Sequence, residues 1–140
     1  MQDQLIQTLT DLVRINSVNP DLSNDGQGER EIAEYVQGHF QGLGIPSNVH
    51  TVKGDRCNTT AFIIGDDPNR ILLMNGHLDT VGIEGMNKPF TIRKDGDKLY
   101  GRGTYDMLAG CAIQMGLATY FSKNPCPISL AFTFVADEEN

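Results

Sequence analysis

The chain has 140 residues and a formal net charge of -7 at pH 7, with 39% hydrophobic and 21% charged residues. This length is enough for one domain with a hydrophobic core, and the composition is that of a globular protein. The negative net charge argues against nucleic acid or an anionic membrane as the main partner.

The N-terminal stretch MQDQLIQTLTDLV contains Asp3 and Asp11, and it lacks the basic start and the long apolar run of a signal peptide. No stretch of the sequence is apolar for long enough to cross a bilayer. The three cysteines, Cys57, Cys111 and Cys126, are widely spaced and form no CxxC pair. They indicate small buried side chains and a reducing compartment, so we expect a cytoplasmic protein.

Hydrophobic periodicity predicts helices that alternate with strands along the chain. The predicted elements are a helix over 5–13, a loop over 16–28, a helix over 32–43, strands over 47–53, 59–65 and 70–74, a hairpin around 95–96, a helix over 107–121 and a strand over 127–136. The apolar runs at 70–74 and 127–136 are typical of buried strands. Asn75-Gly76 is predicted to be the turn that ends the first of these two strands.

Helices that alternate with buried strands predict an α/β fold with a mostly parallel sheet. Binding sites in such sheets lie outside the carboxyl ends of the strands. His77 and Asp79 follow one predicted strand, and the acids of residues 137–139 follow another. We therefore expect these two groups of polar side chains to converge at one edge of the sheet.

His77 and Asp79 are the first candidate site residues. A metal-bound histidine usually donates its other ring N–H to an oxygen acceptor, and Asp79 could supply one. The H-x-D pattern is weak by itself, because a single histidine has many structural roles.

Asp106 lies at the start of the predicted helix over 107–121, within LYGRGTYDMLAG. One alternative is that Asp106 caps this helix through its free backbone N–H groups. Another alternative is a dinucleotide site, since Gly101-x-Gly103 precedes a helix. That motif requires a third glycine where this chain has Asp106, and it follows a strand of a βαβ unit rather than a hairpin.

The segment ADEE supplies Asp137, Glu138 and Glu139 after the last predicted strand. The acids could simply mark the return of the chain to solvent, but adjacent carboxylates repel one another unless a cation compensates them. One glutamate could then bind a metal while the other moves a proton. With His77 and Asp106 they form a nitrogen and oxygen ligand set that suits zinc, cobalt or manganese, and a bridging aspartate would hold two ions close together.

Three motifs carry a resemblance to a known family: NGHLDTV at 75–81, YGRGTYDMLAG at 100–110 and ADEE at 136–139. In this order they resemble the di-zinc amidohydrolase and exopeptidase family that includes acetylornithine deacetylase, succinyl-diaminopimelate desuccinylase, carboxypeptidase G and aminoacylase. RINSVNP at 14–20 is also similar, and it is nearest to the deacetylase and desuccinylase branch.

The resemblance implies roles for individual residues. His77 would ligate one zinc ion with the support of Asp79, Asp106 would bridge two zinc ions, and Glu139 would bind the second ion. Glu138 would be the general base. Asp79 and Glu138 would be the two catalytic residues. The family often has a cis peptide bond after its bridging aspartate, here Asp106–Met107. Co²⁺ or Mn²⁺ could replace Zn²⁺.

The resemblance also implies a zinc-exopeptidase-like catalytic domain with three layers, helix–sheet–helix, and a mixed sheet. Residues 1–140 would be the N-terminal portion of that domain. The family's remaining carboxylate ligand, its C-terminal histidine and its smaller dimerisation domain have no match in the chain. Leu108 and Ala109 also depart from the family, which usually has lysine and often has glycine there.

The implied activity is hydrolysis of the amide bond of an N-acyl amino acid or short peptide, in amino-acid metabolism. The substrate would be a small molecule, with no nucleic acid or membrane partner, and the full-length protein would be a homodimer. The alternative is that the chain is a truncated, non-catalytic fragment with a partial metal site.

Overall fold

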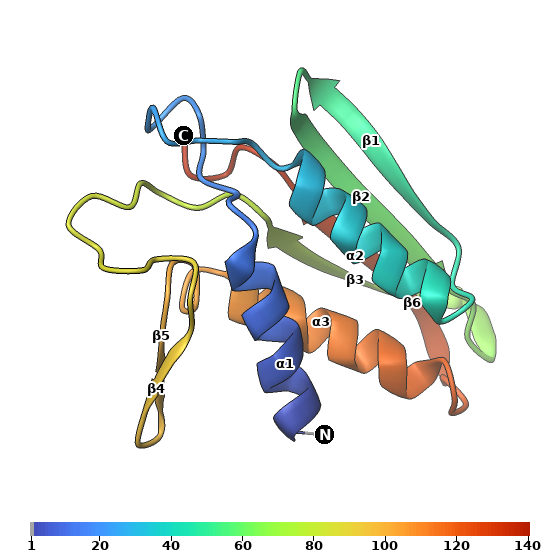
Figure 1. Cartoon of the computed structure of the whole chain (residues 1–140). Coiled ribbons are helices and arrows are strands. Elements are labelled where there is room, and N and C mark those ends of the chain that lie inside the picture. Colours follow the sequence, from blue (N-terminus) through green and yellow to red (C-terminus); the bar gives the residue numbers. More distant parts are fainter. Residues whose placement is uncertain (1) are drawn as a thin grey trace.

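The computed structural model describes residues 2–140, which form three helices, a four-stranded sheet and a hairpin (Figure 1). The helices are α1 (Gln2–Arg14), α2 (Arg30–Gly42) and α3 (Leu108–Phe121), and the strands are β1 (Ser47–Lys53), β2 (Arg56–Ile63), β3 (Asp67–His77), β4 (Arg93–Asp95), β5 (Lys98–Tyr100) and β6 (Ile128–Val135). The predicted α/β alternation is confirmed. None of the helices in this described part is both long and apolar enough to span a membrane.

The four-stranded sheet has the order β1-β2-β6-β3 and is mixed, as predicted. β1 and β2 are antiparallel because a two-residue turn joins them, with Gly54 at φ +56°. β6 is antiparallel to β2 and parallel to β3, from which α3 separates it along the chain. The expectation of mostly parallel pairing is corrected here: one of the three pairs is parallel, because the hairpin turn fixes one pair and β6 runs against β2.

The helices cover one face of the sheet in the described residues (Figure 1). α2 packs on β1 and β2, α3 contacts β3, and α1 packs against α3. Phe40 of α2 contacts Phe132 and Phe134 of β6, with ring centroids 5.2 and 5.9 Å apart. The expected three-layer arrangement is therefore represented by two of its layers within residues 2–140.

β3 is more exposed than its apolar sequence predicts. Ile71, Leu72 and Leu73 are 58%, 49% and 60% exposed. β3 lies at the edge of the sheet, and no other strand among residues 2–140 pairs with its free side. The prediction of a buried strand at 70–74 is wrong for the described chain, because Ile71 and Leu73 point to the face of the sheet that none of the described helices covers.

β3 also continues through the predicted turn. Asn75 pairs with Thr133 and His77 with Val135, so Asn75 and Gly76 belong to the strand and His77 is its last residue. A Cβ at Gly76 would lie 2.9 Å from the side chain of Gln114 in α3. The glycine is therefore required for close packing of α3 on β3 rather than for a turn.

Candidate metal centre

The carboxyl ends of β3 and β6 meet at one edge of the sheet, because the two strands are parallel and in register at His77 and Val135. His77 ends β3, and residues 137–139 follow β6. Asp106 reaches the same place from the segment before α3. The structure thus brings together the predicted residues from three separate parts of the chain.

One ligand atom from each of His77, Asp106 and Glu139 lies within 4.8 Å of the others. Nε2 of His77 is 3.1 Å from Oδ1 of Asp106 and 3.6 Å from Oε2 of Glu138. His77 is buried, whereas the side chains of Asp106 and Glu138 are 66% and 58% exposed. The imidazole therefore forms the floor of an open site with carboxylates at its rim.

His77 is oriented by Asp79. Its Nδ1 donates to the backbone carbonyl oxygen of Asp79 at 3.0 Å, and the Asp79 carboxylate lies 3.4 Å from the same nitrogen. The Nδ1 proton leaves Nε2 free to face Asp106. The Asp79 side chain, together with Asp106, raises the pKa of His77 to about 9 against the opposing effect of burial. The two aspartates therefore favour a positive charge on the imidazole of His77.

Asp79 has a second task that its sequence context does not suggest. Its fully buried carboxylate accepts hydrogen bonds from the backbone N–H groups of Glu138 and Glu139, at 3.1 and 3.0 Å, and from the side-chain amide of Asn19 at 3.0 Å. Burial alone would raise the pKa of Asp79, but the hydrogen bonds from His77 and these groups hold it well below its ordinary value. An ionised Asp79 thus anchors the acid segment, which we define as residues 137–139.

The electrostatics of Glu139 fit a bound cation. Burial raises its pKa, and the neighbouring carboxylates of Asp106, Asp79 and Glu138 raise it further, while the charge of His77 opposes them. A divalent ion among these groups would offset the mutual repulsion of the carboxylates. One imidazole nitrogen with carboxylate oxygens is a donor set that suits zinc, cobalt or manganese.

Asp106 does not cap α3. Met107 is the N-cap residue and no side chain bonds the free N–H groups there, whereas Oδ1 of Asp106 faces His77. The Asp106–Met107 peptide bond is cis, as the resemblance implies. The dinucleotide alternative requires a strand of a βαβ unit before the glycines. The β4–β5 hairpin precedes Gly101-x-Gly103 instead, so the structure does not favour this alternative.

Residues 73–140, which include all the candidate donors, match the sequence pattern of Peptidase family M20/M25/M40. The matched segment, just under half of the chain, is therefore similar to that peptidase family. The similarity extends further towards the N-terminus in pairwise comparisons. The chain is 30% identical over 131 residues to a probable succinyl-diaminopimelate desuccinylase of Staphylococcus aureus, covering 90% of this chain and 30% of that protein. It is 34% identical over 155 aligned positions to an uncharacterized metallohydrolase of Methanocaldococcus jannaschii, covering 99% and 37%.

Solved structures of the same fold include human carnosine dipeptidase 1, with a TM-score of 0.77 and 22% identity over 99% of this chain and 32% of that one. A Bacillus subtilis protein, described as a dinuclear metal-binding peptidase of the family, has a TM-score of 0.66 and 18% identity over 98% and 36%. The predicted fold class is thereby confirmed. The chain spans about a third of the length of the curated relatives that it matches.

Three residues around the acid segment escaped the sequence analysis, and all three precede the part of the chain that matches the peptidase family. They are Asn19, Glu29 and Arg56, which bond to Asp79, to one another or to Asp137. Asn19 lies in RINSVNP, whose resemblance to the family was a usable signal. Glu29 and Arg56 had no local signal, because an acid before a helix and an arginine after a turn are common at solvated surfaces.

Proposed function

We propose that the chain supplies the N-terminal portion of the catalytic domain of a metal-dependent hydrolase. As a complete enzyme it would cleave the amide bond of an N-acyl amino acid or a short peptide. The observation that carries this proposal is the convergence of His77, Asp106 and Glu139, whose ligand atoms lie within 4.8 Å of one another at the edge of the sheet. The desuccinylase and dipeptidase named among the relatives support this substrate class.

His77, Asp106 and Glu139 would hold the metal, for which zinc is our first choice and cobalt or manganese the alternatives. The dinuclear description of the Bacillus subtilis relative supports a second ion, with Asp106 as the bridging residue. A bound divalent ion polarises the scissile carbonyl group and lowers the pKa of a water molecule.

Glu138 is the proposed general base. Its carboxylate is 58% exposed beside His77, so it can reach both a water molecule and a substrate at the open rim of the site. It would accept a proton from the attacking water and donate that proton to the departing amine nitrogen. Asp79 would keep Glu138 in place through the backbone N–H bond of 3.1 Å and would orient His77.

The finer features of the proposal rest on the family resemblance. We propose a deacetylase-like or desuccinylase-like enzyme of amino-acid metabolism that acts in the cytoplasm and is a homodimer as a full-length protein. Cys57, Cys111 and Cys126 are free and buried, which supports a reducing compartment.

The alternative is that the chain by itself is a non-catalytic piece with a partial metal site. The observation in its favour is that three residues form the metal-type cluster within residues 2–140, and that two of them are at least partly exposed. Amidase activity of the 140-residue chain would rule this alternative out.

The experiment that tests the proposal compares Glu138→Gln with the unaltered protein in its full-length form, on a panel of N-acyl amino acids and dipeptides. General-base catalysis is worth about 10²–10⁴-fold, so turnover should fall by at least about 100-fold. Metal content, measured by atomic emission, should stay the same because Glu138 is not a proposed ligand. Normal turnover by Glu138→Gln would contradict the assignment.

A further inference from the structure

A buried ion pair lies beside the acid segment and outside the candidate metal centre. Both oxygens of Glu29, which is fully buried, accept hydrogen bonds from Nε of Arg56, at 3.0 and 2.7 Å. The Arg56 side chain is only 9% exposed. Burial alone would lower the pKa of Arg56, but its bonds to Glu29 and Asp137 outweigh burial and raise the pKa above its ordinary value. The guanidinium therefore stays charged.

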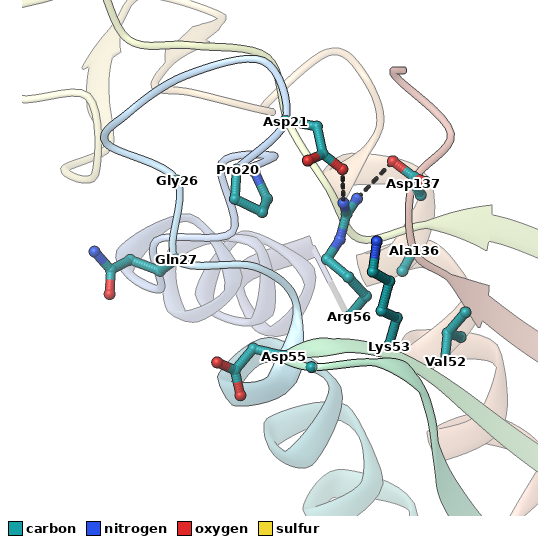
Figure 2. Close-up of a pocket in the computed structure, with 11 residues that line it drawn as sticks. Pro20, Asp21, Gly26, Gln27, Val52, Lys53, Asp55, Arg56, Ala136 and Asp137 are labelled. Carbon is teal, nitrogen blue, oxygen red and sulfur yellow. Dashed lines mark hydrogen bonds and ion pairs between the residues drawn. The ribbon is translucent and has the colours of Figure 1, made fainter.

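The other two nitrogens of Arg56 reach two further parts of the chain. Nη1 donates to Asp21, in the loop after α1, at 2.9 Å, and Nη2 donates to Asp137 at 2.8 Å. Figure 2 shows the guanidinium between these two carboxylates, in the wall of a pocket of about 400 Å³. Arg56 thus ties the loop after α1 and the start of α2 to the acid segment.

Asp137 connects Arg56 to the candidate metal centre. Its backbone lies in the left-handed region, with φ +66°, which aspartate tolerates better than most residues. Its Oδ1 accepts hydrogen bonds from Arg56 and from the side-chain amide of Asn19, the latter at 3.1 Å. Because residue 137 turns the chain after β6, these bonds fix the direction in which Glu138 and Glu139 leave the sheet.

The charge of Arg56 does not by itself favour a cation nearby. A guanidinium repels a divalent ion, and the repulsion is stronger where burial reduces the screening by water. Arg56 would therefore favour a nearby metal centre through hydrogen bonds with fixed directions, and not through its charge.

We propose that Arg56 is a positioning residue, which acts through Asp137 to direct Glu138 and Glu139 into the metal centre. Arg56 holds the carboxylate of Asp137, and Asp79 receives the backbone N–H groups of the two glutamates, so the acid segment is fixed from two sides. The inference rests on the proposed function, because Arg56 has this task only if the acid segment binds a metal.

The test measures Co²⁺ binding by the metal-free 140-residue chain, with calorimetry for the affinity and visible absorption for the coordination geometry. Arg56→Gln removes the guanidinium, and the matched control Lys53→Gln removes an exposed positive charge from the same pocket (Figure 2). Coulomb repulsion alone predicts that both variants bind Co²⁺ at least as tightly as the unaltered chain. Positioning predicts instead that Arg56→Gln binds about 10-fold or more weakly, with an altered spectrum.

A second set of variants leaves the Arg56–Glu29 pair intact. Asp137→Gly removes the carboxylate that Arg56 holds and still permits a positive φ, and it should bind Co²⁺ about 10-fold more weakly. Asp137→Asn makes the same change in charge but keeps an oxygen acceptor, so it should bind more tightly than Asp137→Gly. Asp21→Asn changes an exposed partner of Arg56 that belongs to the loop after α1 and not to the acid segment, and it should bind normally.

Normal affinity and spectrum in both Arg56→Gln and Asp137→Gly would overturn the inference and leave the proposed function standing. A lower melting temperature of Arg56→Gln with unchanged Co²⁺ affinity would give Arg56 a purely structural role and would also overturn it. If Arg56→Gln does not fold, the Asp137 variants decide. Failure of the unaltered chain to bind Co²⁺ would overturn the inference for this chain, and it would leave the proposed function to the Glu138→Gln test on the full-length protein.

Discussion

The carboxylate of Asp79 accepts a hydrogen bond from the backbone N–H of Glu139 at 3.0 Å, across 60 residues of sequence. This bond joins the ends of two parallel strands, because Asp79 follows β3 and Glu139 follows β6. The same aspartate supplies the backbone oxygen that accepts the Nδ1 proton of His77. One residue therefore fixes both the imidazole and the acidic side of the candidate centre.

Asp79→Asn should destabilise the chain and weaken metal binding. The amide loses the charge that its N–H partners stabilise and leaves buried donors poorly satisfied, which costs about 2–3 kcal/mol. Urea unfolding measures this loss, and zinc calorimetry measures the affinity. Asp97→Asn, at an exposed position of the β4–β5 hairpin, is the control and should behave like the unaltered chain. Equal stabilities of the two variants would show that Asp79 is not an anchor.

Two glycines should respond to alanine in opposite directions. A Cβ at Gly76 would lie 2.9 Å from Nε2 of Gln114 and 3.2 Å from Sγ of Cys111. Gly76→Ala should therefore overpack this contact and lower the free energy of unfolding by about 1–3 kcal/mol. Gly38 is exposed within α2 and has nothing within 4 Å of its Cβ position, so Gly38→Ala should raise the free energy of unfolding by about 0.5–1 kcal/mol. The midpoints of urea unfolding check both signs. A stabilising Gly76→Ala would contradict the close approach of α3 to β3.

His39 should make the chain less stable in acid. Burial lowers its pKa from 6.5, and its Nε2 lies 3.2 Å from the carbonyl oxygen of Met115 and 3.1 Å from Oγ1 of Thr119. The pKa of His39 is lower in the folded chain than in the unfolded chain, so the unfolded chain takes up this proton first as the pH falls. The contribution of neutral His39 to the free energy of unfolding is therefore complete above about pH 6.5 and is lost as the pH falls through the folded-state pKa.

Unfolding free energies between about pH 7.5 and pH 5 measure the effect of His39. His39→Gln should lose less stability over this range than the unaltered chain. His50→Gln, which removes an exposed imidazole from β1, is the control. Identical pH dependence of His39→Gln and the unaltered chain would contradict the neutral, partly buried state of His39.

Cys111 should be unreactive in the folded chain. Burial raises the pKa of its thiol to about 12, and its Sγ donates to the backbone carbonyl oxygen of His77 at 3.2 Å. The thiolate fraction at pH 8 is then roughly 10⁻⁴. Iodoacetamide followed by peptide mass mapping should find Cys111 unmodified in buffer and modified in urea. Rapid modification of Cys111 in buffer would show that α3 does not pack on β3 as described.

Local patterns predicted much of this fold. The periodicity of α1 and α2 and the Asp95-Gly96 hairpin signal depend on neighbours in sequence, and the structure confirms them. The exposure of Leu73 was not predictable in this way, because Leu73 pairs with Ala131 on the face of the sheet that none of the described helices covers. Gly76 was misinterpreted for a related reason: its close neighbour Gln114 is remote in sequence.

The candidate site likewise contains some residues that the sequence pattern predicts and others that it does not. His77 and Glu139 follow strands whose parallel pairing brings them to one edge, so the sequence pattern was enough to expect their convergence. The contacts of Arg56 with Glu29 and Asp137 span 27 and 81 residues and use residue types that are common on surfaces. These contacts form only when the folded chain brings the residue before α2, the start of β2 and the acid segment together.

Zinc calorimetry on the metal-free chain and on His77→Ala tests the central claim most directly, with His50→Ala as the control for loss of an imidazole. We predict that the unaltered chain and His50→Ala bind zinc alike, and that His77→Ala binds at least about 100-fold more weakly, since even residues that only support a ligand are worth 10–100-fold. Equal zinc binding by His77→Ala and the unaltered chain would contradict a metal centre at the ends of β3 and β6.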